Sequence, residues 1–89
     1  MRSRNKAVPE NFGVIVGSII RDTMLSKNLK KSEVVNRLDI PRSSVHDIID
    51  GKIKKPSFWA VFRIVTDGLG VKYSTFAKKM EAVKYDFLD

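Results

Sequence analysis

Basic and polar side chains gather in residues 27–55, where eight basic residues stand against four acidic ones. Guanidinium, ammonium and hydroxyl groups hydrogen-bond to phosphate oxygens and to base edges, so this composition indicates binding to a polyanion. The first six residues add three basic residues and no acid, whereas residues 57–89 are nearly balanced. The net charge of +7 is therefore unevenly placed, which favours a binding role over simple solubility.

The spacing of apolar residues predicts two short helices joined by a tight turn, over residues 31–38 and 41–50. Val45 supplies the branched apolar side chain that two steeply crossing helices need in the middle of the second one. Asp39 tolerates the left-handed backbone conformation, and Ile40 is expected to fill the turn. We therefore expect residues 31–50 to form a helix-turn-helix unit.

The outward face of the second helix is predicted to carry Arg42, Ser43, His46, Asp47 and Asp50. Short polar side chains at a helix N-terminus can approach base edges in the DNA major groove, which is about 12 Å wide. Arg42 can bond O6 and N7 of guanine; the alternatives are a phosphate contact or an intrahelical pair with Asp47 or His46. His46 either contacts a base or phosphate or is an incidental surface residue.

Three further helices are predicted around this unit, which makes the chain an all-α domain of five short helices. The first covers about residues 10–26. A fourth starts after Ser57 as its N-cap and ends at Gly68 and Gly70, and a fifth is capped by Ser74. No segment alternates in the manner of a β-strand.

The aromatic residues of the fourth helix have helical spacing. This spacing favours a place in the core for Phe58, Trp59 and Phe62 over a base-stacking platform. The residues expected to face inward from the fifth helix are Phe76, Met80 and Val83.

Composition excludes several classes of site. The chain has no cysteine and a single histidine, His46, which excludes disulfides, thiolate metal sites and histidine clusters. Without a glycine-rich phosphate loop or a catalytic carboxylate pair, we expect no enzyme, no metal and no cofactor. No apolar stretch is long enough to span a membrane, and no secretory signal is apparent. We expect a cytoplasmic protein, associated with the nucleoid through DNA.

Several of these features occur together in one known family. The segments at 42–45 (Arg-Ser-Ser-Val), 50–52 (Asp-Gly-Lys), 56–57 (Pro-Ser) and 69–71 (Leu-Gly-Val) resemble the Xre-type helix-turn-helix of lambda-repressor-like proteins. The resemblance covers about residues 12–82. It implies a compact five-helix lambda-repressor-like domain that binds double-stranded DNA.

The resemblance also implies roles for single positions. Lys31 stands where the family usually has Gln, which contacts a phosphate and braces the recognition helix; lysine keeps the charge but not the amide's two-way hydrogen bonding. Arg42 matches a base-reading position, and Ser43 matches a position that reads a base or a phosphate.

A basic loop follows the recognition helix, which Gly51 is expected to end as a C-cap residue. In the family the stretch matched by Asp50, Lys52 and Lys54 holds the DNA backbone. Together with Lys55, these lysines are expected to clamp phosphates; without the preceding helices they would be a solvated charge run.

Besides Lys31, four positions depart from the family pattern. Val35 replaces a usual Ala and Asp39 a usual Gly, which implies slightly altered helix packing. Asp47 and Asp50 place carboxylates on the presumed DNA face, where phosphates repel them. They accept a hydrogen bond from a cytosine amino group, pair with Arg42, or lie at the edge of the interface.

The two ends of the chain are expected to lie outside the domain, which spans residues 9–84. Residues 1–8 form a flexible basic arm that either tracks a DNA groove or is simply disordered. Residues 85–89 form a tail whose apolar members are Tyr85, Phe87 and Leu88. This tail either folds back on the domain or, as we favour, meets a second copy in a homodimer.

These features predict a transcriptional regulator, a phage or mobile-element type repressor that occludes a promoter by binding a palindromic operator. The alternative is an antitoxin or repressor-partner module that uses the same fold to bind a protein. The candidate DNA-binding residues are Lys31, Arg42, Ser43, Ser44, His46, Asp47, Lys52, Lys54, Lys55, Arg2 and Arg4.

Overall fold

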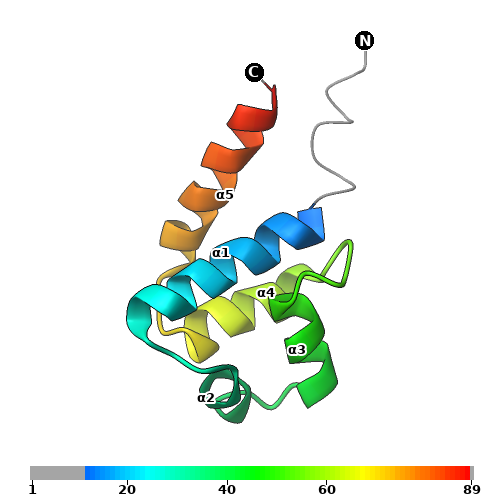
Figure 1. The fold of residues 1–89 in the computed structure, drawn as a ribbon, viewed down its shortest axis with the longest axis vertical. Coiled ribbons are helices and arrows are strands. Elements are labelled where there is room, and N and C mark those ends of the chain that lie inside the picture. The colour runs from blue at the N-terminus through cyan, green and yellow to red at the C-terminus, as the bar shows by residue number, and fades with distance from the viewer. Residues whose placement is uncertain (1–11, 89) are drawn as a thin grey trace.

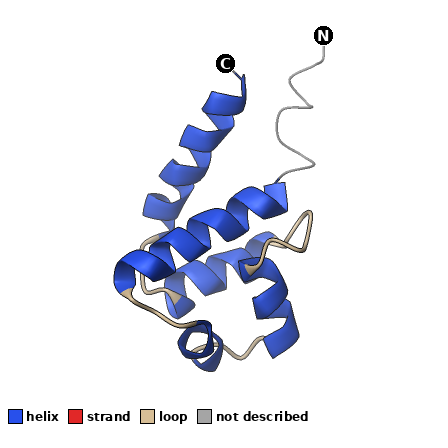
Figure 2. Ribbon diagram, in the orientation of Figure 1, coloured by secondary structure: helices blue, strands red, loops and turns tan. Residues whose placement is uncertain are grey.

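The structure, a computed structural model, describes residues 12–88, with side chains to residue 83 (Figure 1). Its elements are α1 (Phe12–Lys27), α2 (Lys31–Asn36), α3 (Arg42–Ile49), α4 (Phe58–Arg63), the π-helical turn η3 (Ile64–Gly68) and α5 (Tyr73–Leu88). Within this part of the chain all regular structure is helical (Figure 2), which confirms the predicted all-α class with five α-helices.

The helices pack around α1, which crosses the middle of the molecule in Figure 1. The pair α2 and α3 lies at one end, and α5 extends from the other end beyond the rest. The core joins side chains from all six elements: Val16, Ile19, Ile20, Met24, Val34, Val35, Val45, Ile48, Ile49, Val61, Ile64, Val65, Leu69 and Phe76. Phe76, Met80 and Val83 face this core from α5, as predicted.

Two glycines bring α1 into close contact with the end of α3 and the loop after it. A Cβ atom on Gly13 would lie 1.7 Å from the carbonyl oxygen of Ile53, and one on Gly17 would lie 2.8 Å from the Gly51 nitrogen. The Gly13 N–H also donates to the Lys54 carbonyl at 3.0 Å. Since no side chain separates these backbones, α1 fixes the position of α3 directly.

The end of the fourth helix widens into a π-turn that the sequence did not indicate. The Leu69 N–H donates to the carbonyl of Ile64, five residues earlier, at 2.8 Å. The extra residue in this turn rotates the following side chains relative to an α-helix. Ile64 and Val65, the first two residues of this turn, are both fully buried.

The predicted core placement of the α4 aromatic residues is wrong for two of them. Phe58 is 64 % exposed and Trp59 is 63 % exposed, while Phe62 is half-buried. Phe58 and Trp59 belong to the first turn of α4, before the buried face formed by Val61 and η3 begins. Their rings pack on neighbouring rings instead: Trp59 stacks on Phe62 with centroids 5.9 Å apart.

Several helix ends also differ from the predictions. Helix α2 ends at Asn36, and Asp39 does not adopt the expected left-handed conformation. Among the described non-glycine residues, Asn28 after the end of α1 does so, with a φ of 57°. There Asn28 closes α1: its N–H donates to Leu25, and that of Leu29 donates to Met24. Helix α5 starts at Tyr73, so Ser74 lies inside it and is not its cap.

Helix α5 continues to Leu88, so the expected domain boundary at residue 84 falls within a helix. The side chains of the predicted apolar tail lie outside the described residues. None of the helices in the described part of the chain has the length and apolar character required to cross a membrane.

Candidate functional site

Helices α2 and α3 meet across residues 37–41 and cross steeply, since α2 is seen nearly end-on in Figure 1 while α3 lies along the page. Val45 in the middle of α3 is fully buried, as the helix-turn-helix prediction required. Ile40 in the turn is half-buried and packs against the core. The predicted arrangement of helix, turn and helix is therefore present.

The two ends of α3 differ in exposure. At its start Arg42 and Ser43 are exposed, whereas Ser44, His46 and Asp47 are half-buried. The N–H groups of Ser44 and Val45 donate to the Pro41 carbonyl at 3.0 and 3.2 Å, so the first turn of α3 is closed internally. Arg42 and Ser43 are thus the exposed side chains of α3.

The C-terminal end of α3 closes as predicted, with Gly51 in the left-handed conformation at a φ of 75°. The N–H of Lys52 returns to the Asp47 carbonyl at 2.9 Å, which completes a Schellman motif. Arg21 of α1 donates to the Ile49 carbonyl at 2.6 Å. In the loop that follows, the side chains of Lys52, Lys54 and Lys55 are exposed.

An ion pair joins the start of α2 to the end of α3. The Lys31 ammonium lies 2.5 Å from the Asp50 carboxylate, and their side chains are 39 % and 29 % exposed. The hydrogen bond from Lys31 holds the pKa of Asp50 below its ordinary value, although burial opposes this effect. The sequence does not indicate this pair, because Lys31 and Asp50 are far apart along the chain.

Arg63 and Arg37 brace the other side of the unit. Arg63 donates to Asp67 at 2.6 Å and to Asp39 at 3.2 Å, which ties the α2–α3 turn to the end of α4. Arg37 donates to the Gly68 carbonyl at 2.8 Å. Asp39 therefore accepts from Arg63 in the turn, a contact that its place in the sequence does not indicate.

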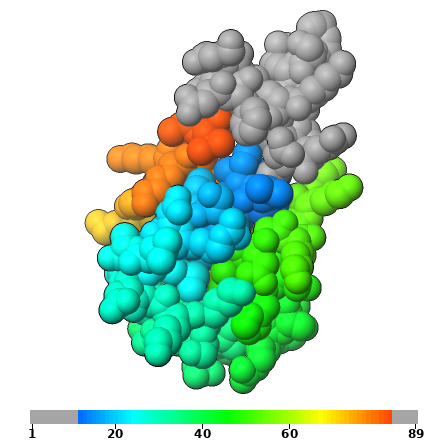
Figure 3. Space-filling view, viewed as in Figure 1, coloured from blue at the N-terminus to red at the C-terminus, as the bar shows by residue number. Residues whose placement is uncertain are grey.

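Ser44, His46 and Asp47 lie half-buried along α3, and the other described site residues fall into three groups. Arg42 and Ser43 project from the start of α3, the three loop lysines follow its end, and Lys31 is drawn to Asp50. The surfaces of α1 and α3 adjoin on the face seen in Figure 3, so the C-terminal end of α3 lies beside α1. Arg2 and Arg4 lie outside the described residues.

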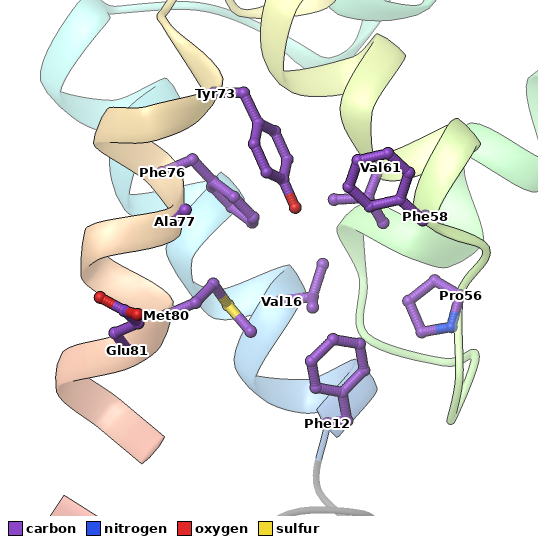
Figure 4. A pocket seen from close by; sticks show the side chains of 10 residues that line it. All are labelled: Phe12, Val16, Pro56, Phe58, Val61, Tyr73, Phe76, Ala77, Met80 and Glu81. Atoms are coloured by element: carbon purple, nitrogen blue, oxygen red, sulfur yellow. The ribbon is translucent and has the colours of Figure 1, made fainter. Parts of the chain in front are cut away.

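A groove of about 310 Å³ lies between α1, α4 and α5 (Figure 4). Phe12, Tyr73 and Met80 reach into it from α1 and α5, and Phe58 closes it on the α4 side. Glu81 is the one lining side chain that is charged at neutral pH, and it stands beside α5 at the margin (Figure 4). The groove is therefore an apolar surface.

Within the described residues, no three His, Asp or Glu side chains come together in a group that could hold a metal ion. Comparison of the chain with protein-family models, with curated proteins and with solved structures finds no match.

Proposed function

We propose that this chain is a sequence-specific double-stranded DNA-binding transcriptional regulator of the phage or mobile-element repressor type. The observation that carries the proposal is the exposed start of α3, with Arg42 and Ser43, on a helix whose other face is buried. A helix anchored in this way is able to enter a major groove with its first residues toward the bases. The resemblance to the Xre-type family supports the same function.

The exposed lysines after α3 support phosphate binding. Lys52, Lys54 and Lys55 follow the C-terminal end of the helix that would enter the groove. Phosphate contacts fix the register of a protein on the duplex, whereas base contacts specify the sequence. Arg42 and Ser43 are placed to contact bases, and the loop lysines are placed to contact phosphates.

As a homodimer, the protein would place two α3 helices about 34 Å apart, one DNA turn, and read a palindrome. Repression would follow from occlusion of a promoter. The protein would act by binding alone, without catalysis and without a cofactor.

Selection of bound sequences from a random duplex pool tests the proposal. We expect enrichment of one motif, and two inverted copies of it if a dimer binds. A pool that stays random after several rounds contradicts sequence specificity.

The exposed aromatic rings favour a second candidate, an antitoxin or repressor-partner module that binds a protein. Phe58 and Trp59 offer the kind of side chains that anchor protein interfaces. Salt dependence separates the candidates, because phosphate contacts release counterions and affinity then falls steeply with salt. Flat salt dependence on duplex, without motif selection, favours the protein-binding module.

A further inference from the structure

The Lys31–Asp50 pair joins the two helices that would meet DNA. Lys31 is the first residue of α2, and Asp50 is the C-cap residue of α3. The 2.5 Å separation of ammonium and carboxylate is a direct, charge-assisted hydrogen bond. Each ammonium bound to a carboxylate in this way is occupied, so it offers less charge to a phosphate.

The position of Asp50 at the C-terminal end of α3 favours its pairing with a cation. A carboxylate is unfavourable near the C-terminus of a helix, where free carbonyls concentrate negative charge. Arg21 neutralises part of this charge through the Ile49 carbonyl, and Lys31 neutralises the Asp50 side chain. Lys52 and His46 lie close enough to attract the same carboxylate more weakly.

We infer that Asp50 is a positioning residue that keeps the ammonium of Lys31 away from DNA phosphates and so weakens non-specific binding. This inference rests on the proposed function, since it concerns the same surface. It assigns a role to the Asp50 carboxylate, which would otherwise only repel DNA. It also separates Lys31 from the loop lysines, for which the described side chains show no ion pair.

The test is a double-mutant cycle on a random-sequence duplex of about 20 base pairs, with affinity measured from low to high salt. Each phosphate contact adds about 0.9 to the slope of log affinity against log salt. Asp50→Asn should steepen the slope by about 0.9, which corresponds to roughly eightfold tighter binding for each tenfold dilution of salt. In the Lys31→Met background the same substitution should leave the slope nearly unchanged.

Asp47→Asn is the matched control, because it removes a carboxylate from the same helix. If Asp50→Asn gives equal gains with and without Lys31, or gains no more than Asp47→Asn, the carboxylate acts by direct repulsion and the inference is wrong. An unchanged slope in Asp50→Asn is equally decisive against it. Wild-type protein whose duplex binding ignores salt would instead overturn the proposed function, and the inference with it.

A purely structural role is separated by circular dichroism of every variant at each salt concentration. If Asp50→Asn does not fold, the comparison of Lys31→Met with Lys54→Met decides. Because Lys31 is already occupied, Lys31→Met should reduce the slope by less than half as much as Lys54→Met. Equal losses would show that Lys31 contacts phosphate as freely as a loop lysine.

Discussion

Arg42 and Lys54 are both exposed basic residues, but they stand at opposite ends of the surface that would meet DNA. Arg42→Ala should cost about 1–3 kcal/mol at the selected motif and relax the preference at one base. Lys54→Ala should weaken binding to all duplexes alike, since phosphates carry no sequence; the Lys54 carbonyl that holds Gly13 is kept. Affinities on the selected motif and on a scrambled duplex measure both effects, and identical behaviour of the two variants contradicts these roles.

Asp50 also predicts how stability depends on pH. Its pKa is lowered in the folded protein, chiefly by the hydrogen bond from Lys31, so below neutrality the unfolded chain binds the proton first. The stabilisation is therefore present above the unfolded pKa, about 3.9, and is lost as pH falls through the lower folded pKa.

Thermal unfolding at pH 7 and pH 3 measures this loss. The wild type should lose more stability between the two than Asp50→Asn, which has no titrating group at this position. Equal losses in the two proteins would mean that the pair does not contribute to acid sensitivity.

At the scale of single residues, the sequence predicted which side chains are exposed better than it predicted which side chains pair with one another. Charge and helical spacing placed Arg42, Ser43 and the loop lysines on the surface, where the structure has them. The Lys31–Asp50 and Arg63–Asp39 pairs depend on how distant elements pack, and no local pattern encodes that.

Among the elements, the contact of α1 with the end of α3 is the most sensitive to added volume. Gly13→Ala would place a methyl group against the Ile53 carbonyl, and backbone cannot yield as a flexible side chain does. We expect a loss of about 3 kcal/mol or more in the free energy of unfolding.

Gly70→Ala is the control for this substitution. Gly70 has a φ of 73° but open space around it, so only the backbone strain of about 1 kcal/mol applies. Urea unfolding compares the two variants. A Gly13→Ala protein as stable as Gly70→Ala would show that the α1 contact can relax.

The start of α4 has a cap that the sequence correctly indicated. The Ser57 hydroxyl accepts from the Ala60 N–H at 3.1 Å, so Ser57→Ala should cost about 1 kcal/mol. Ser74→Ala should change stability little, because Ser74 is an exposed residue within α5. Chemical denaturation of both variants measures the difference, and a larger loss for Ser74→Ala would contradict these assignments.

Apolar periodicity predicted that each of the five helices is present, but it did not predict where several of them end. The five α-helices, the buried Val45 and the Gly51 cap were all predicted. The π-turn was missed because it preserves the same apolar residues while adding one residue to a single turn. Phe58 and Trp59 lie on the surface because they belong to the first turn of α4, before its buried face begins at Val61.

For the molecule as a whole, the net charge of +7 should dominate binding to random duplex. If the three loop lysines each neutralise one phosphate, the slope of log affinity against log salt is about −2.7 per protomer. Fluorescence anisotropy of a labelled duplex across salt concentrations measures it. A slope weaker than about −1 would contradict phosphate binding by this surface.

The exposed position of Trp59 has a practical consequence, since it is the only tryptophan in the chain. Its indole is largely exposed, stacks on Phe62, and has the Arg63 guanidinium 5.9 Å from the ring centroid. Tryptophan emission, excited selectively, therefore comes from one known place on α4. A blue shift of this emission would mean that the surface around Trp59 has been covered. Association at this surface can therefore be followed without an added label.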